Sequence, residues 1–129
     1  MVYNTYMIPI SCSAYYYGGL PIKGSRRKGR LCVKEDVFHL EVPGRKGADK
    51  IDLKIPFSRM ERLFLSQDNY YGTDTILFNL AFRDQAGKAY TLRFAPITII
   101  PRRRIALQKK WFGYLADAIQ KNSFASSAS

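Results

Sequence analysis

A short segment near the N-terminus concentrates positive charge among glycines. Its five cations are Lys23, Arg26, Arg27, Lys28 and Arg30. Arginine offers forked N–H donors to phosphate oxygens, lysine offers a mobile point charge, and glycine lets backbone N–H groups approach an anion. These residue types at this spacing favour binding of a phosphate group or another acidic surface. The competing interpretation is a solvated basic loop with no specific ligand.

Two further basic groups follow along the chain. They comprise Arg45, Lys46 and Lys50, then Arg102, Arg103, Arg104, Lys109 and Lys110. The three consecutive arginines fall at the start of a predicted helix, where the helix dipole disfavours cations. We expect solvent, rather than a bound anion, to screen them.

The residues give little support for catalysis. His39 is the only histidine, and as a general base it would need a nucleophile such as Cys12, Cys32 or a serine beside it. The spacing does not indicate such a pair, so we expect a structural role for His39. Two cysteines and one histidine do not make a zinc set unless a carboxylate joins them. We therefore predict a protein that is not an enzyme and needs no cofactor or metal.

Composition bounds the possible partners. The 129 residues carry 21 basic and 10 acidic side chains, for a net charge of +11, and 47% of them are hydrophobic. This balance predicts one folded domain that attracts acidic partners. The N-terminal residues lack the positive start of a secretion signal, and Cys12 and Cys32 are too few for a disulfide framework. The expected location is the cytoplasm, at the periphery of a membrane if the ligand is a lipid.

Eight alternating or aromatic-rich apolar segments look extended, and together they predict about seven short strands. They are residues 5–10, 14–17, 30–34, 37–42, 51–55, 60–66, 75–83 and 88–95. Glu35-Asp36 suits a hairpin turn, and so does the stretch 84–87, whereas 67–74 is predicted to be a loop. Such spacing favours an antiparallel sandwich or barrel.

The last third of the chain predicts a helix over about 102–121. Pro101 is suited to the first turn, and apolar residues such as Trp111, Leu115 and Ile119 recur at three- and four-residue steps. The domain is expected to cover 1–124, with a flexible tail at 125–129.

Three stretches resemble the pleckstrin-homology (PH) superfold, in particular GRAM and bacterial PH-like domains. They are Gly29–Val33 with Phe38–Leu40, the run Lys54–Ser58 leading to Arg62–Leu65, and the closing helix with its single Trp111. A middle stretch also resembles the PH-like middle domain of the small subunit of the FACT histone chaperone. Arg26 and Arg30 fit the Arg-x-x-x-Arg opening of PilZ domains, but the companion motif is absent.

The PH resemblance implies a seven-stranded antiparallel barrel capped by the helix, with Trp111 closing the open end. It also implies that a basic loop between the first two strands holds phosphorylated lipid headgroups, with the loop at 43–50 beside it. Lys23, Arg26, Arg27, Lys28 and Arg30 would contact the headgroup, and Arg45 and Lys46 would support them. The sequence leaves the oligomeric state open.

Two alternatives remain at this point. PH-like sheets often bind peptides by strand addition or along the helix edge, which suits a protein-interaction module without lipid binding. Nucleic-acid or histone association would suit the net charge and the FACT-like stretch, and tyrosines such as Tyr15 and Tyr70 could stack on bases. In strands and loops, however, tyrosines are more typical of packing.

Overall fold

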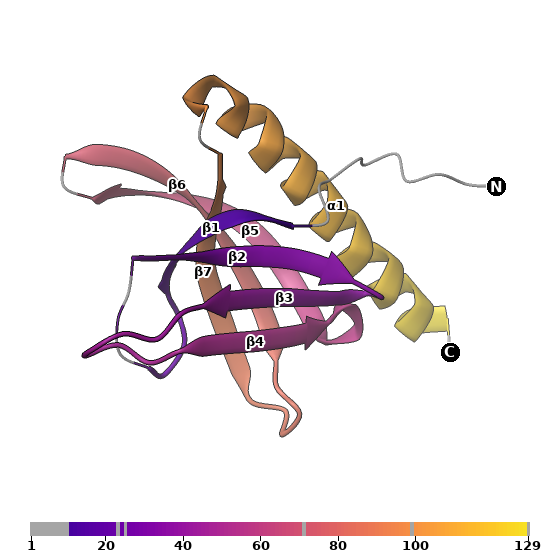
Figure 1. Cartoon of the computed structure of the whole chain (residues 1–129). Coiled ribbons are helices and arrows are strands. Elements are labelled where there is room, and N and C mark those ends of the chain that lie inside the picture. Colours follow the sequence, from indigo (N-terminus) through magenta and orange to yellow (C-terminus); the bar gives the residue numbers. More distant parts are fainter. Residues whose placement is uncertain (1–10, 23, 25, 71, 99, 129) are drawn as a thin grey trace.

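The computed structural model describes residues 11–128 apart from 23, 25, 71 and 99. Its elements in chain order are β1 (Ser11–Gly18), β2 (Arg27–Lys34), β3 (Val37–Val42), β4 (Ile51–Pro56), the short 3₁₀ helix η1 (Phe57–Arg59), β5 (Met60–Tyr70), β6 (Thr73–Arg83), β7 (Ala89–Ile97) and α1 (Pro101–Ala128). The seven strands form one antiparallel sheet in the order β4-β3-β2-β1-β7-β6-β5, and α1 packs against β5, β7 and η1 (Figure 1). A mostly β fold with one C-terminal helix is therefore confirmed.

Closure of the sheet into a barrel is not observed. β4 and β5 lie at the two opposite ends of the strand order, and no pairing joins them within the described residues. The chain passes from one edge to the other through Pro56 and η1, which interrupt the ladder because proline cannot donate a backbone hydrogen bond. The strand predicted at 5–10 lies outside the described residues.

The β2–β3 hairpin agrees with its prediction. Glu35 and Asp36 form its two-residue turn with φ values of 54° and 61°. Two consecutive positive φ values are those of a type I′ turn, whose twist matches that of the flanking strands. The turn fixes the register, so that Cys32 lies opposite His39 and Arg30 opposite Glu41.

The β5–β6 hairpin corrects the loop predicted at 67–74. Both strands continue to the tip, where Tyr70 pairs with Thr73. The polar residues at the tip are poor strand formers, but they hydrogen-bond to one another. Asn69 Nδ2 donates to Asp74 Oδ1 at 3.1 Å, and the Gly72 N–H donates to Asn69 Oδ1 at 3.0 Å. Local hydrogen bonds thus replace the apolar packing that a strand usually needs.

The core lies between the sheet and α1. Trp111 is fully buried in it, together with Leu115 from the helix and Phe38, Phe78 and Phe94 from the sheet. The apolar stripe predicted for the helix therefore faces the strands. The helix itself is longer than the predicted 102–121 and includes 125–128 of the expected flexible tail. Alanine and serine at that end are compatible with helix, alanine being the strongest helix former.

Candidate functional site

Two basic loops lie against each other at one end of the sheet. The loop between β1 and β2 approaches the loop between β3 and β4 so closely that a Cβ on Gly24 would stand 2.7 Å from the Cβ of Ala48. The Arg27 guanidinium joins the same two segments, because its Nη1 donates to the Pro43 carbonyl at 3.2 Å. The loop at 43–50 therefore lies beside the segment that precedes and opens β2.

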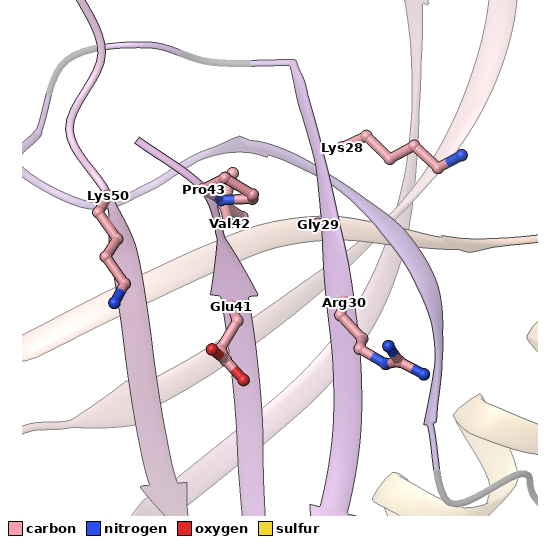
Figure 2. Close-up of a pocket in the computed structure, with 7 residues that line it drawn as sticks. All are labelled: Lys28, Gly29, Arg30, Glu41, Val42, Pro43 and Lys50. Carbon is pink, nitrogen blue, oxygen red and sulfur yellow. The ribbon is translucent and has the colours of Figure 1, made fainter. Parts of the chain in front are cut away.

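A groove of about 590 Å³, here called the basic groove, lies on the sheet next to these loops. It is lined by Lys28, Gly29, Arg30, Glu41, Val42, Pro43 and Lys50 (Figure 2). Three of these side chains are cations and one is a carboxylate, so the groove carries a net positive charge. Its three cations are all exposed, which leaves their charge available to a ligand.

Strand geometry explains this lining. Alternate residues of a strand point to opposite faces, so Lys28 and Arg30 share the outer face while Leu31 is fully buried on the inner one. Figure 2 shows Glu41 between Arg30 on one side and Lys50 on the other. Gly29 lets the strands approach, because a Cβ there would stand only 2.2 Å from the Glu41 carbonyl oxygen.

The structure brings together only part of the predicted basic set. Lys28 and Arg30 line the basic groove, and Lys50 joins them from the start of β4. Arg26, Arg45 and Lys46 are exposed in the adjoining loops but do not line it. Lys23 lies outside the described residues.

Arg27 corrects the prediction that all the clustered cations face a ligand. Its side chain is only 3% exposed, and it lies on the inner side of β2. Its Nη1 atom donates to the Pro43 carbonyl, whereas its Nε and Nη2 atoms have no hydrogen-bond partner among the described residues. Burial on the inner face removes Arg27 from any surface that a headgroup could reach, and its contact ties β2 to the β3–β4 loop.

A second group of polar side chains, here called the His39 cluster, lies on the outer face of β2, β3 and β4. Its members are Cys32, His39, Glu41 and Asp52. His39 Nε2 lies 2.5 Å from Asp52 Oδ1, and His39 Nδ1 lies 3.8 Å both from Cys32 Sγ and from Glu41 Oε1. The hydrogen bond from His39 holds the pKa of Asp52 below its usual value.

Sequence reasoning missed this cluster, although one signal for it was present. The predicted turn at Glu35-Asp36 already fixes which residues of the hairpin face each other, and it places Cys32 opposite His39. Asp52 could not be placed in the same way, because the alignment of β4 beside β3 depends on the long loop between them.

A third feature is an apolar groove of about 370 Å³ between α1 and the β5–β6 hairpin. It is lined by Leu65, Ile76, Phe78, Ile105, Gln108, Lys109, Phe112 and Gly113. Ile105 is 64% exposed, Leu65 48% and Ile76 46%. The β5–β6 hairpin thus carries apolar side chains beyond the part of the sheet that α1 covers.

Comparison with known proteins gives no relative from which a function could be transferred: no family model, curated protein or solved structure matches the chain. Within the described part of the chain, no helix combines the length and the apolar character needed to cross a bilayer. The grooves and side-chain clusters themselves are therefore the features that bear on function.

Proposed function

We propose that the protein is a non-catalytic, PH-like binding module whose basic groove docks on acidic phospholipid headgroups of the phosphoinositide type. The observation that supports this best is the placement of Lys28, Arg30 and Lys50 around one groove beside two contiguous basic loops. Arg26, Arg45 and Lys46 are exposed nearby and would add attraction to the membrane surface. Arg27 is assigned a structural role instead.

The charge arrangement favours a ligand with more than one phosphate. Arg30 and Lys50 stand on opposite sides of Glu41 (Figure 2), so a single small anion between them would meet the carboxylate. A polyphosphorylated headgroup can place one phosphate toward Lys28 and Arg30 and another toward Lys50. Each cation near an anionic surface contributes about 1 kcal/mol, and salt weakens the attraction.

Vesicle sedimentation tests the proposal. Vesicles of phosphatidylcholine are compared with vesicles that also contain a phosphoinositide, and with vesicles carrying the same charge as phosphatidylserine. Wild-type protein should prefer the phosphoinositide, and the triple variant Lys28→Ala, Arg30→Ala, Lys50→Ala should lose at least about tenfold in affinity, as expected from three such contacts.

The matched control removes three cations far from the groove, at Arg102, Arg103 and Lys110, which are exposed on α1. This variant should bind nearly as well as wild type. Equal losses in the two variants would show that net charge alone drives binding, and would contradict a headgroup site. Binding to duplex DNA with a steep salt dependence, without vesicle binding, would favour the nucleic-acid alternative instead.

A second candidate function rests on the apolar groove. The groove is lined by large exposed apolar side chains, which suit a peptide that inserts one or two apolar side chains. Lys109 lies in its wall, and Arg102 to Arg104 are exposed close by in sequence, so an acidic peptide of a protein partner would fit best. Ile105→Glu should abolish such binding because it places a charge in the groove. Arg59→Glu, outside the groove, is a control whose change in net charge is larger than that of Ile105→Glu. Peptide binding that survives Ile105→Glu would rule this groove out.

A further inference from the structure

Four side chains that carry metal-binding chemistry share the outer face of β2, β3 and β4. Cys32 lies directly across from His39, and Glu41 follows His39 by two residues on the same strand face. Asp52 lies on β4 opposite Glu41. One ligand atom from each of His39, Glu41 and Asp52 lies within 4.8 Å of the others. Hydrogen-bonded strands hold all four positions, so the group is built on rigid elements rather than on loops.

The contact between His39 and Asp52 determines how the imidazole is oriented. An ionised carboxylate can only accept a hydrogen bond, so His39 Nε2 carries the proton that it shares with Asp52 Oδ1 at 2.5 Å. In the neutral imidazole, Nδ1 is then left with a free lone pair. The orienting carboxylate on one ring nitrogen and the free lone pair on the other form the arrangement that metal-binding histidines usually have.

The free nitrogen faces the two remaining groups. His39 Nδ1 lies 3.8 Å from Cys32 Sγ and 3.8 Å from Glu41 Oε1. Around a tetrahedral zinc ion, ligand atoms of these types stand about 3.3–3.7 Å apart, given the usual bond lengths. His39 Nδ1 therefore needs to approach each of the two groups by only a few tenths of an ångström. Cys32 is not in the group of atoms that lie within 4.8 Å of one another, so the exposed Glu41 side chain must also rotate toward Cys32 for the three to share one ion.

From this geometry we propose that Cys32, His39 and Glu41 bind a divalent metal ion of the zinc class, and that Asp52 is the positioning residue for His39. One sulfur, one nitrogen and one oxygen ligand suit a borderline ion such as Zn²⁺, whereas Mg²⁺ and Ca²⁺ require oxygen ligands throughout. The thiolate and the carboxylate together supply two negative charges to match the ion. The fourth position is open on the solvent side of the sheet.

The observations behind this inference do not depend on the proposed lipid binding, and metal titration of the 129-residue chain tests it. Protein stripped with a chelator is titrated with Zn²⁺ by calorimetry and with Co²⁺ by absorption spectroscopy. We expect one ion per chain, protons released on binding, and a thiolate-to-cobalt charge-transfer band that reports a bound cysteine.

Variants assign the ligands. Cys32→Ser should remove the charge-transfer band, and His39→Gln should weaken binding at least about tenfold. Asp52→Asn should weaken binding about 10–100-fold while the band remains at saturating Co²⁺, because Asp52 orients a ligand without being one. Cys12→Ser is the control that keeps both affinity and band, and thermal melts without metal show that each variant is folded.

Several outcomes would overturn the proposal. They are absence of saturable Zn²⁺ binding by the wild-type protein, a band that survives Cys32→Ser, and affinity unchanged by His39→Gln. Rapid alkylation of Cys32 that depends on His39, in a protein that binds no metal, would instead assign the same contacts to a reactive thiol.

Discussion

Gly29 controls how closely β2 and β3 approach beside the basic groove. A Cβ at this position would stand 2.2 Å from the Glu41 carbonyl oxygen and 2.6 Å from Val42 Cγ2. Gly29→Ala should therefore lower the free energy of unfolding by about 3 kcal/mol, because a paired backbone carbonyl cannot easily move. Chemical denaturation measures this loss.

Gly87→Ala is the control for that substitution. Gly87 has a φ of +85° and nothing within 4 Å of its ideal Cβ, so alanine there meets backbone strain but no clash. Its cost should be about 1 kcal/mol. Equal costs at the two positions would show that the close approach at Gly29 is not a constraint.

The Cys12 thiol predicts a loss of stability at alkaline pH. Burial raises its pKa from 9.0 to about 11, although the nearby Trp111 side chain opposes the rise. Because the folded pKa lies above the unfolded one, the folded state holds the proton more tightly. The stabilisation is fully present below pH 9 and is lost as the pH rises to about 11.

The measurement is the free energy of unfolding from pH 8 to pH 11 for wild type and Cys12→Ala. The difference between the two should shrink as the pH rises through this window. Tyr16 and Tyr114, whose pKa values are also raised by burial, contribute equally to both proteins and cancel in the difference. A constant difference would contradict a buried, protonated thiol.

Individual site residues could be predicted only where the strand pattern was visible. Lys28 and Arg30 are exposed, as a ligand-binding role requires, but they belong to strand β2 rather than to the predicted loop, and the sequence did not distinguish Arg27 from them. The sequence pattern indicated a strand from residue 30 onward, whereas β2 begins at Arg27. Because the predicted strand did not include Arg27, the inward and outward alternation of strand side chains could not be used to predict that Arg27 points inward.

At the scale of elements, Trp111 of α1 lies in the core that the helix shares with the sheet. It is fully buried, and its ring meets Tyr114 edge-on at a centroid distance of 6.4 Å. Trp111→Ala should destabilise the fold by about 3–5 kcal/mol, because the cavity cannot be filled by neighbouring strands. Ile105→Ala, on the exposed part of the same helix, should change the stability by less than about 0.5 kcal/mol. Similar losses would mean that the helix is not anchored by its tryptophan.

The start of α1 is electrostatically unfavourable. Its first turn has no acidic residue, and Arg102, Arg103 and Arg104 are exposed there. Arg103→Glu should raise the free energy of unfolding by about 1 kcal/mol, since an anion complements the positive end of the helix dipole. Lys110→Glu makes the same change in net charge further along the helix and should stabilise less. Equal effects would attribute the gain to net charge rather than to position.

Elements could be predicted where local pattern and tertiary packing agree. The β2–β3 hairpin and the helix have strong alternation, turn residues or a three- to four-residue apolar spacing, and both were found. The ends of β5 and β6 were missed because Gln67, Asp68 and Asn69 are stabilised by cross-strand partners rather than by their own propensity. An open sheet was not predicted in place of a barrel, because the pairing of strands that are distant in sequence produces no local sequence pattern.

At the scale of the whole molecule, excess positive charge opposes folding. The net charge is +11, and few ion pairs occur among the described residues, one being Arg83 with Glu61 at 2.9 Å. Salt should therefore raise the thermal midpoint, because the screening length falls from about 10 Å at 0.1 M to about 3 Å at 1 M. Calorimetry across this range measures the shift.

A variant with Arg102, Arg103 and Arg104 all changed to Gln has its charge reduced from +11 to 11 − 3 = +8. It should show a smaller rise in midpoint over the same range. A midpoint that falls with salt would mean that attractive pairs outweigh the general repulsion.

Glu41 belongs both to the wall of the basic groove and to the His39 cluster, where its Oε1 lies 3.8 Å from His39 Nδ1. A cation that neutralises this carboxylate from one side removes a repulsion that an anion would meet on the other. Thermodynamic reciprocity then requires each ion to strengthen the binding of the other by the same factor. If both proposals hold, the shared Glu41 side chain couples the two sites, and this face of the sheet binds phosphate most tightly when the metal is also bound.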